Sequence, residues 1–336
     1  MKMTTVNPWT LTGWHEQVYA WIQAQLAHQA ITITGQIEQP HIRPWSTVLR
    51  IPTAEGDVYF KAVNPDLIHE VAVTQALLDW FPELMPHTYA IDATQGWLLM
   101  PDGGTRFREV NKAEHDLGRW ETILPRYAET QIALASRVPE LLAMGVPDRR
   151  PAVLADLVEQ ILADTPALMV DQADGLSKDE VERLLALRPR IRHLCEQLTN
   201  APIPASLDHG DFHDANIFLN NNQPVFFDWG DCSLGHPFFS LRTTFVNIEY
   251  IFELPEDAPP FARLRDAYLE PWTPFANHHQ LGQIFNVAKQ LAPLSALLRW
   301  HLAIQVLPLE KRAEYAAAVP SLLQEFLDLQ NKIAVS

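Results

Sequence analysis

The spacing of hydrophobic positions changes from helical to strand-like and back within the first hundred residues. Residues 10–28 carry apolar side chains at helical spacing, which predicts an opening amphipathic helix. The next segments are short and rich in β-branched or aromatic residues, so they predict a small antiparallel sheet with strands at 31–37, 46–52 and 57–63. Helical periodicity returns at 66–80. Two further strands are expected at 87–92 and 96–100.

A Pro-Gly break at residues 101–104 marks the change to a mostly helical chain. Apolar stripes predict helices near 115–136, 151–163 and 177–199, and Ser177 with Glu180 forms a capping box at the start of the last one. The region 206–230 is the exception, because its two short apolar runs predict a hairpin with strands at 217–219 and 224–227. Helices are expected again from 238 to 333, with breaks at prolines near 255–260, 271–274, 308 and 320.

These patterns together predict an α+β protein with an N-terminal sheet region. We expect that region at 1–100, a linker at 101–104 and a helical region at 105–336.

Composition narrows the class of protein. Hydrophobic residues make up 47% of the 336 residues, which is enough for a globular core. The formal charge of −16 would repel the phosphates of nucleic acid, so nucleic acid is not an expected partner. No signal-peptide or membrane-span pattern is present, and the two cysteines, Cys195 and Cys232, form no CxxC pair. We therefore expect a cytoplasmic protein that does not enter a membrane.

One motif carries the strongest chemical signal. His209-Gly210-Asp211 is followed by Asn216, by the predicted hairpin and then by Asp228-Trp229-Gly230. This H-G-D-x-x-x-x-N and D-x-G pattern resembles the catalytic and metal-binding loops of the aminoglycoside phosphotransferase and choline kinase family, relatives of the protein kinases. The resemblance implies a two-lobed protein-kinase-like fold. It also implies a small-molecule kinase that transfers the γ-phosphoryl group of ATP or GTP to an acceptor hydroxyl.

The same resemblance assigns roles to residues of the motif. Phosphoryl transfer depends mainly on positioning the acceptor and on neutralising phosphate charge with metal. Asp211 is expected to accept the proton or hydrogen bond of the acceptor hydroxyl. Asn216 and Asp228 offer hard oxygen ligands that suit Mg²⁺, and His209 is expected to brace the loop.

A kinase of this kind also needs a lysine and a glutamate in its N-terminal lobe. Lys61 lies on the third expected strand, and Glu70 is the first acidic residue well inside the following helix. Where such kinases hold the purine, the chain has Met100 to Asp102, whose backbone groups are candidate contacts. Pro101 between them has no N–H to donate.

Three features depart from the family pattern. Residues 35–46 contain no G-x-G-x-x-G, so other groups must cover the nucleotide phosphates. Trp229 stands where protein kinases have Phe. Ser240 stands where many relatives have an acid after G-x-P, so the interaction that this acid makes with the catalytic loop is either absent or rebuilt here.

The motifs leave the acceptor open. Asp231 and Glu249 follow the metal loop closely enough to reach an acceptor, and acidic side chains suit an amine-bearing alcohol such as an aminoglycoside, choline or an amino sugar. A neutral sugar or a macrolide is equally compatible with the motifs. Nothing in the sequence indicates an oligomeric state.

Two other readings of the same residues remain. One is a catalytically inactive nucleotide-binding module with the kinase fold, which the missing glycine-rich loop favours. The other is a metal-dependent hydrolase that uses the cluster His209, Asp211, His213 and Asp214. Such sites normally recruit further histidines from distant segments, and the remaining histidines form no second cluster in the sequence.

Overall fold

The computed structural model describes residues 7–335, and their contacts divide them into two compact units. The first unit contains the described residues through Val110 together with 214–230 and 306–311. The second contains 111–213, 231–305 and the described residues from 312 onward. The boundary expected at 101–104 stays a prediction. The contacts add that the segment with the predicted metal ligands, 214–230, belongs with the N-terminal sheet.

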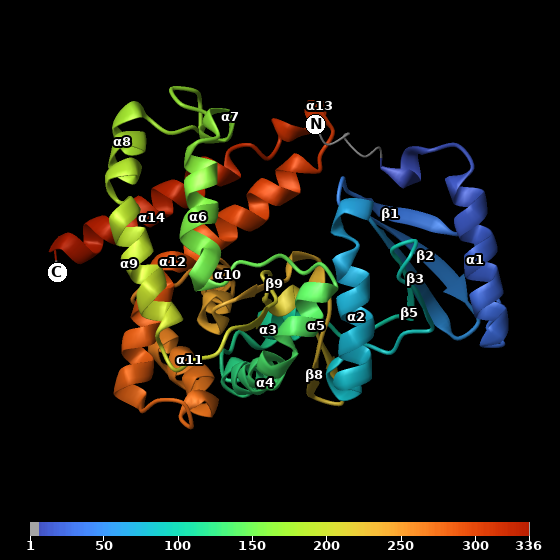
Figure 1. Cartoon of the computed structure of the whole chain (residues 1–336). Helices are drawn as coiled ribbons and strands as arrows, with labels where there is room; N and C mark the ends of the chain where they lie inside the picture. The colour runs from blue at the N-terminus through green and yellow to red at the C-terminus, as the bar shows by residue number, and fades with distance from the viewer. Residues whose placement is uncertain (1–6, 336) are drawn as a thin grey trace. The chain divides into compact units, whose positions relative to one another are not determined.

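A five-stranded antiparallel sheet forms the centre of the first unit, in the order β1-β2-β3-β5-β4 (Figure 1). Its strands are β1 (Glu38–Ile42), β2 (Ser46–Thr53), β3 (Gly56–Val63), β4 (Ala90–Asp92) and β5 (Trp97–Pro101). Helix α1 (Trp14–His28) packs on one face through Val18 and Ile22, against Phe60 of β3. Because side chains alternate along a strand, Lys61 points to the opposite face, where α2 (His69–Trp80) lies.

The strand expected at 31–37 is wrong. The first strand is β1 at Glu38–Ile42, and Ile33 makes an isolated bridge to Thr53. The β1 segment contains Pro40, which weakens any strand signal in the sequence. The edge of a sheet tolerates proline, and the register between β1 and β2 shifts there, between Glu38 and His41.

The expected hairpin is confirmed, with strands β7 (Ile217–Asn220) and β8 (Gln223–Phe226). Its turn consists of Asn221 and Asn222, whose φ values are 51° and 63°. Two consecutive residues with positive φ define the two-residue turn that matches strand twist, and asparagine adopts this conformation more readily than most residues.

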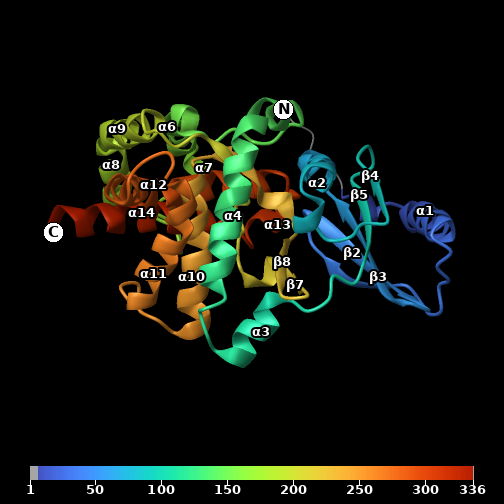
Figure 2. The same cartoon turned by 90° about the horizontal axis from the view of Figure 1, so that it is seen from below.

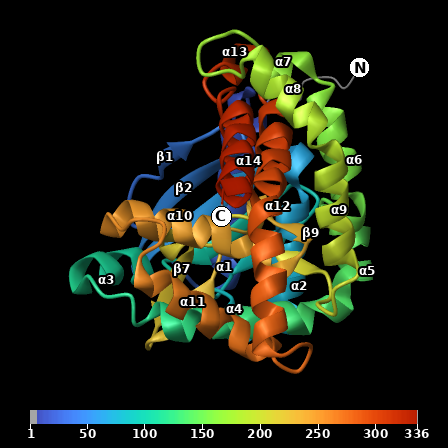
Figure 3. The same ribbon diagram turned by 90° about the vertical axis from the view of Figure 1, so that its left-hand side faces the viewer.

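The second unit is mostly helical, and Figures 2 and 3 show its helices from two further sides. They are α4 (Trp120–Leu134), α5 (Val138–Ala143), α6 (Pro151–Leu162), α7 (Thr165–Leu168), α8 (Lys178–Ala186), α9 (Arg188–Thr199), α10 (Ser240–Phe252), α11 (Pro259–Leu269), α12 (His278–Gln305) and α14 (Ala318–Val335). Strands β6 (Ser206–Asp208) and β9 (Ser233–Gly235) form a small sheet within it. The remaining helices, α3 (Phe107–Glu114) and α13 (Leu309–Arg312), are divided between the two units.

Helix α12 forms the centre of the second unit, with α14, α9 and α6 packed against it. Figure 3 shows α12 and α14 side by side. The capping box of Ser177 and Glu180 is confirmed at the start of α8. The break expected near Pro320 is confirmed: α14 begins at Ala318 after a turn, and Pro320 lies in its first turn, where a helix tolerates proline. None of the helices within residues 7–335 is both long and apolar enough to cross a membrane.

Candidate active site

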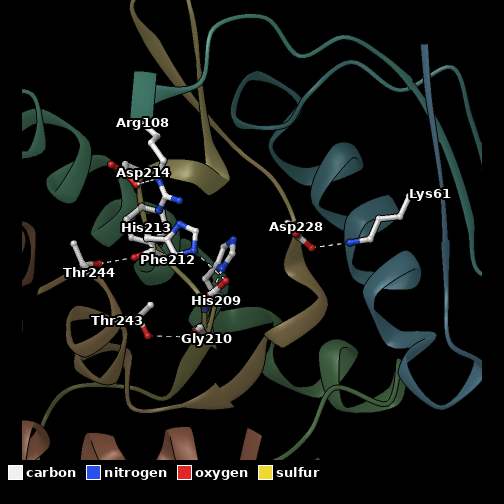
Figure 4. Close-up of polar contacts among 11 residues, drawn as sticks. Lys61, Arg108, His209, Gly210, Phe212, His213, Asp214, Asp228, Thr243 and Thr244 are labelled. Atoms are coloured by element: carbon white, nitrogen blue, oxygen red, sulfur yellow. Dashed lines mark hydrogen bonds and ion pairs between the residues drawn. The ribbon is translucent and has the colours of Figure 1, made fainter. Parts of the chain in front are cut away.

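Lys61 lies between two carboxylates of the first unit. Its Nζ is 2.5 Å from Oε1 of Glu70 and 2.6 Å from Oδ1 of Asp228. Glu70 is in the first turn of α2 and is only 4% exposed. Figure 4 shows the Lys61 side chain extending from its strand toward Asp228. The structure thus joins three predicted site residues, of which Asp228 is 167 residues from Lys61 in the sequence.

The charges around Lys61 keep it protonated. Burial alone would lower the pKa of this ammonium, but the carboxylates of Asp228 and Glu70 outweigh burial and raise the pKa above its ordinary value. Lys61 is therefore a fixed positive charge, which suits it to contact phosphate oxygens.

The loop that holds Asp228 has an unusual backbone. Asp228 itself has a φ of 65°, a left-handed conformation that non-glycine residues rarely adopt and that clusters at functional sites. Two residues later, a Cβ added to Gly230 would lie 2.8 Å from Oε2 of Glu70. The glycine of the D-x-G motif therefore gives Glu70 the space to approach Lys61.

Asn216 lies at the base of the hairpin, at the end of a short 3₁₀ turn, η5 (Asp214–Asn216). Its backbone carbonyl accepts a hydrogen bond from the N–H of Phe227, 3.2 Å away, so Asn216 is joined to the residue just before Asp228. The neighbouring Asp214 is fully buried and accepts a hydrogen bond from Nε of Arg108 at 2.7 Å. The side-chain amide oxygen of Asn216 and the carboxylate of Asp228 are the ligand types that Mg²⁺ prefers.

Backbone N–H and carbonyl groups at the end of β5 point alternately to the two sides of the strand. Leu99 accepts a hydrogen bond from the N–H of Tyr89, whereas the N–H of Asp102 donates to the carbonyl of Asp57. Because successive backbone groups of an extended chain point to opposite sides, the carbonyl of Pro101, the last residue of β5, faces the same side as that of Leu99. The N–H of Asp102 is already used within the sheet, so it is not available to a purine.

The loop with Asp211 belongs to the second unit and is held by backbone contacts. The N–H of Asp211 donates to Nδ1 of the buried His209 at 3.3 Å. From α10, Thr243 donates to the carbonyl of Gly210 and Thr244 to that of Phe212, as Figure 4 shows. These contacts fix the course of the loop on both sides of Asp211.

Gly210 is required by space as well as by conformation. Its φ is 77°, and an added Cβ would lie 2.2 Å from the carbonyl oxygen of Asp231. No side chain fits there unless the backbone moves.

Asp211 is ionised and partly accessible. Its carboxylate oxygen Oδ2 is 3.2 Å from Nε2 of His213, and its side chain is 35% exposed. Burial would raise the pKa of this carboxyl, but the hydrogen bond and charge of His213, with Arg299 and His209, hold the pKa well below its usual range. Asp211 thus offers a negatively charged acceptor for a hydrogen bond.

A buried network supports this loop, and the sequence reasoning missed most of it. Ser240 donates to Oδ1 of Asp208 at 2.6 Å, and the same oxygen accepts the N–H of Gly210. Tyr127 accepts the N–H of His209 and stacks on Phe212, with ring centroids 3.8 Å apart. Gln131 adds bonds to the carbonyl of Leu207, to Tyr127 and to Ser240. Two features of the sequence could have indicated this network. Ser240 stands where many relatives have an acid, and an acid, Asp208, directly precedes His209.

The two residues expected to bind an amine have cationic neighbours. The charge of Asp231 acts on the buried Arg149. Glu249 lies on α10 among Glu256, Lys289 and other charged residues, and burial raises its pKa.

The hydrolase cluster is not formed. No group of three His, Cys, Asp or Glu side chains in residues 7–335 is arranged to hold a metal ion. Asp214 is engaged by Arg108, and the ring nitrogen Nδ1 of His209 accepts the N–H of Asp211. This arrangement gives the hydrolase reading no support.

Comparison with known proteins places these features in context. The model of the phosphotransferase enzyme family matches residues 93–281, which is more than half of the chain. The comparison with curated proteins gives no significant match.

Solved structures share the fold at low sequence identity. An ethanolamine kinase from Plasmodium vivax is 12% identical, with a TM-score of 0.58 over 93% of this chain and 88% of its own. A choline/ethanolamine kinase family protein from Mesorhizobium loti is 13% identical, with a TM-score of 0.58 over 92% and 94%. An aminoglycoside phosphotransferase from Streptomyces rimosus, solved with ADP and streptomycin, is 16% identical, with a TM-score of 0.50 over 83% and 98%. The predicted kinase-like fold, an antiparallel sheet region followed by mostly helical chain, is therefore confirmed.

Proposed function

Because the chain belongs to the phosphotransferase enzyme family, we propose that it is a small-molecule kinase that transfers the γ-phosphoryl group of ATP or GTP to an acceptor hydroxyl. The observation that carries the proposal is Lys61 held between Glu70 and Asp228. Structural lysines on sheets seldom contact two carboxylates from distant segments, whereas a kinase needs this triad to bind phosphates and metal.

On the donor side, Lys61 binds the α- and β-phosphates and Glu70 orients it. Asp228 and Asn216 would hold Mg²⁺, and the bound ion would neutralise negative charge on the nucleotide phosphates. Asp228 is 45% exposed in its side chain, so it is accessible to a metal ion. Among the purine contacts predicted at Met100 to Asp102, the carbonyl of Pro101 is the group that accepts from the purine, because the N–H of Asp102 is bound within the sheet.

On the acceptor side, Asp211 accepts the hydrogen bond of the attacking hydroxyl and takes up its proton as the phosphoryl group leaves. A carboxylate kept ionised by His213 orients the hydroxyl well but is a weak base, which suits a loose transition state in which proton transfer is late. His209 holds the loop by accepting the N–H of Asp211.

The related structures support a nucleotide donor and a small acceptor. One was solved with ADP and streptomycin, and others are described as ethanolamine or choline/ethanolamine kinases. The two buried cysteines, Cys195 and Cys232, fit a reducing cytoplasm, where we place the reaction.

The test is a panel of hydroxyl-bearing amines, sugars, acids and antibiotics, incubated with ATP or GTP and Mg²⁺. Asp211→Asn serves as the blank because it keeps the shape of the side chain and removes its charge. We expect at least one acceptor to raise ADP or GDP release by the wild type above that of the variant. Nucleotide binding without release on any acceptor would instead identify an inactive nucleotide-binding module.

A further inference from the structure

A hollow in the second unit borders the loop that carries Asp211. It encloses about 260 Å³ of space free of protein atoms, part of which is open to solvent. Its enclosed part has room for about one water-sized group. The polar walls come from several segments of the unit: Arg149, Asp208, Gly210, Thr243, Ser295 and Arg299.

The sequence of α12 creates the space. Ala292, Ser295, Ala296 and Arg299 all line the hollow and recur at intervals of three and four residues, so they share one face of the helix. Three of the four are small, whereas the neighbouring buried positions Leu291, Leu294, Leu297 and Leu298 of this helix carry leucine. The hollow therefore lies between a face of small residues and the catalytic loop, with Arg299 at one end.

Arg149 is the unusual residue in this wall. It is only 5% exposed, and its backbone N–H is anchored to the carbonyl of Leu234 in β9. Within residues 7–335, its guanidinium makes no hydrogen bond or ion pair, and the same holds for Arg299. By contrast, Arg242 also lines the hollow but is bound to Glu325. Neither arginine is among the fully enclosed groups without a partner in the described residues, so both guanidinium groups open onto the hollow. A guanidinium that faces a partly enclosed space without a protein acceptor is suited to bind a ligand with acceptor oxygens.

The electrostatics indicate the sign of that ligand. Burial and the charge of Arg299 lower the pKa of Arg149 to about 10, against the opposing effects of Asp231 and Asp208. Arg149 is still protonated at neutral pH. The two arginines therefore repel each other across a partly enclosed space, and a negative group between them would relieve both the repulsion and the missing hydrogen bonds.

We propose that Arg149 and Arg299 bind an anionic group, a carboxylate or a phosphate, carried by the acceptor whose hydroxyl is phosphorylated at Asp211. This inference rests on the proposed function, since it names the chemical class of the acceptor. Gly210 lines the hollow, Asp211 is the next residue, and the charge of Arg299 acts on the Asp211 carboxylate, so a hydroxy acid bound at Arg299 lies near that carboxylate. The enclosed part of the hollow admits about one oxygen atom of the anionic group, and the part that is open to solvent accommodates the rest of the molecule.

An anionic acceptor differs from the amine-bearing acceptor expected from Asp231 and Glu249. The charge of Asp231 acts on Arg149 and supports the arginine pair, and Glu249 lies near Lys289. Guanidinium groups bind carboxylate and phosphate oxygens through two parallel hydrogen bonds, and this geometry selects against neutral and cationic groups.

The first experiment measures binding without catalysis. Thermal unfolding is followed with acetate and with acetamide, which share a shape and differ in charge, at equal ionic strength. Arg149→Gln and Arg299→Gln are compared with Arg192→Gln, a surface arginine paired with Asp156 and Glu159. At about ten times its dissociation constant, acetate should raise the Tm of the wild type and of Arg192→Gln by about 2–4 °C. Acetamide should have no effect, and neither hollow variant should respond to acetate.

Equal shifts with acetate and acetamide, or an acetate response that survives in both hollow variants, would contradict the anion site. Arg299 is only half-buried, so its variant should fold even if Arg149→Gln does not.

The second experiment connects the anion to the acceptor. Hydroxy acids and their matched amides are offered as acceptors with ATP and Mg²⁺. The wild type should favour the acid in kcat/KM on the order of 10²-fold, and both hollow variants should lose this preference. Acetate should compete with the acid. Acetate that binds at Arg149 without competing would show a site for a free anion and would refute the acceptor assignment. Acetate binding with no transfer to any acceptor would refute the proposed function and leave the anion site standing.

Discussion

Ser240 and Asp208 are joined by a buried hydrogen bond, in which the serine hydroxyl donates to the carboxylate over 2.6 Å. Asp208 directly precedes His209, and its same oxygen accepts the N–H of Gly210. The acid that many relatives carry at the position of Ser240 is thus replaced by a serine and an acid within the catalytic segment itself. The interaction that supports the loop is rebuilt rather than lost.

Removing this hydroxyl should destabilise the second unit. In Ser240→Ala, the buried Asp208 loses a donor, and Tyr127 and Gln131 lose their contacts with Ser240. We expect the free energy of unfolding to fall by about 2–3 kcal/mol in urea titrations. Ser136→Ala, at an exposed serine of the same unit, should change it by less than about 0.5 kcal/mol. Equal effects of the two substitutions would show that the network contributes no stability.

Gly210 and Gly145 form a matched pair of glycines with positive φ, at 77° and 84°. A Cβ at Gly145 would meet nothing within 4 Å, whereas one at Gly210 would meet the carbonyl of Asp231 at 2.2 Å. We expect Gly145→Ala to cost about 1 kcal/mol from backbone strain alone. Gly210→Ala should cost at least about 2 kcal/mol more, since its backbone must move, and thermal unfolding of both variants measures the difference. A similar cost for both would mean that the loop adjusts freely.

His236 should make the protein sensitive to mild acid. It is 1% exposed, its Nδ1 accepts the N–H of Phe238, and burial lowers its pKa to about 3. Because the unfolded state binds a proton near pH 6.5 and the folded state does not, stability falls as the pH drops below 6.5.

This group should account for about 2 kcal/mol of the loss in stability between pH 7 and pH 5. His236→Asn keeps an acceptor for the N–H of Phe238 and removes the titrating group. Between pH 7 and pH 5, the free energy of unfolding of this variant should therefore fall by about 2 kcal/mol less than that of the wild type. Urea titrations at pH 7 and pH 5 measure this loss for the wild type and the variant, and equal losses in the two proteins would contradict the prediction.

Lys61 should act in catalysis together with Glu70. Lys61→Met removes the charge placed for the nucleotide phosphates, so kcat/KM for the nucleotide should fall on the order of 10²-fold or more. Lys178→Met, at a lysine whose side chain is 77% exposed, should leave it unchanged. If Glu70 works by orienting Lys61, adding Glu70→Gln to Lys61→Met should cause little further loss of activity. If the double variant instead lost activity by the product of the two single losses, Glu70 would act independently of Lys61.

The sequence predicted the elements whose signals are local. The turn of Asn221 and Asn222 follows from residue preferences for positive φ, and the capping box of Ser177 and Glu180 follows from a three-residue spacing. Strand β1 was missed because its Pro40 hides the strand signal, while its place at the sheet edge comes from pairing with β2. Local propensity does not contain that pairing.

The candidate site also contains some residues that the local sequence reveals and others that only the fold brings together. The motif around Asp211, Asn216 and Asp228 has a fixed spacing along the chain, so it could be recognised in the sequence. The roles of Tyr127 and Gln131 could not, because they contact the loop from a helix about eighty residues earlier. The hollow at Arg149 likewise depends on which segments the fold brings together.

The most direct measurement of the central claim is the mass of an acceptor after incubation with ATP and Mg²⁺, compared between the wild type and Asp211→Asn. We expect one added phosphoryl group per ADP released by the wild type, and a rate at least about 10³-fold lower for the variant. Equal product formation by the two proteins would contradict it, because no step in the proposed reaction proceeds at the full rate without the carboxylate of Asp211.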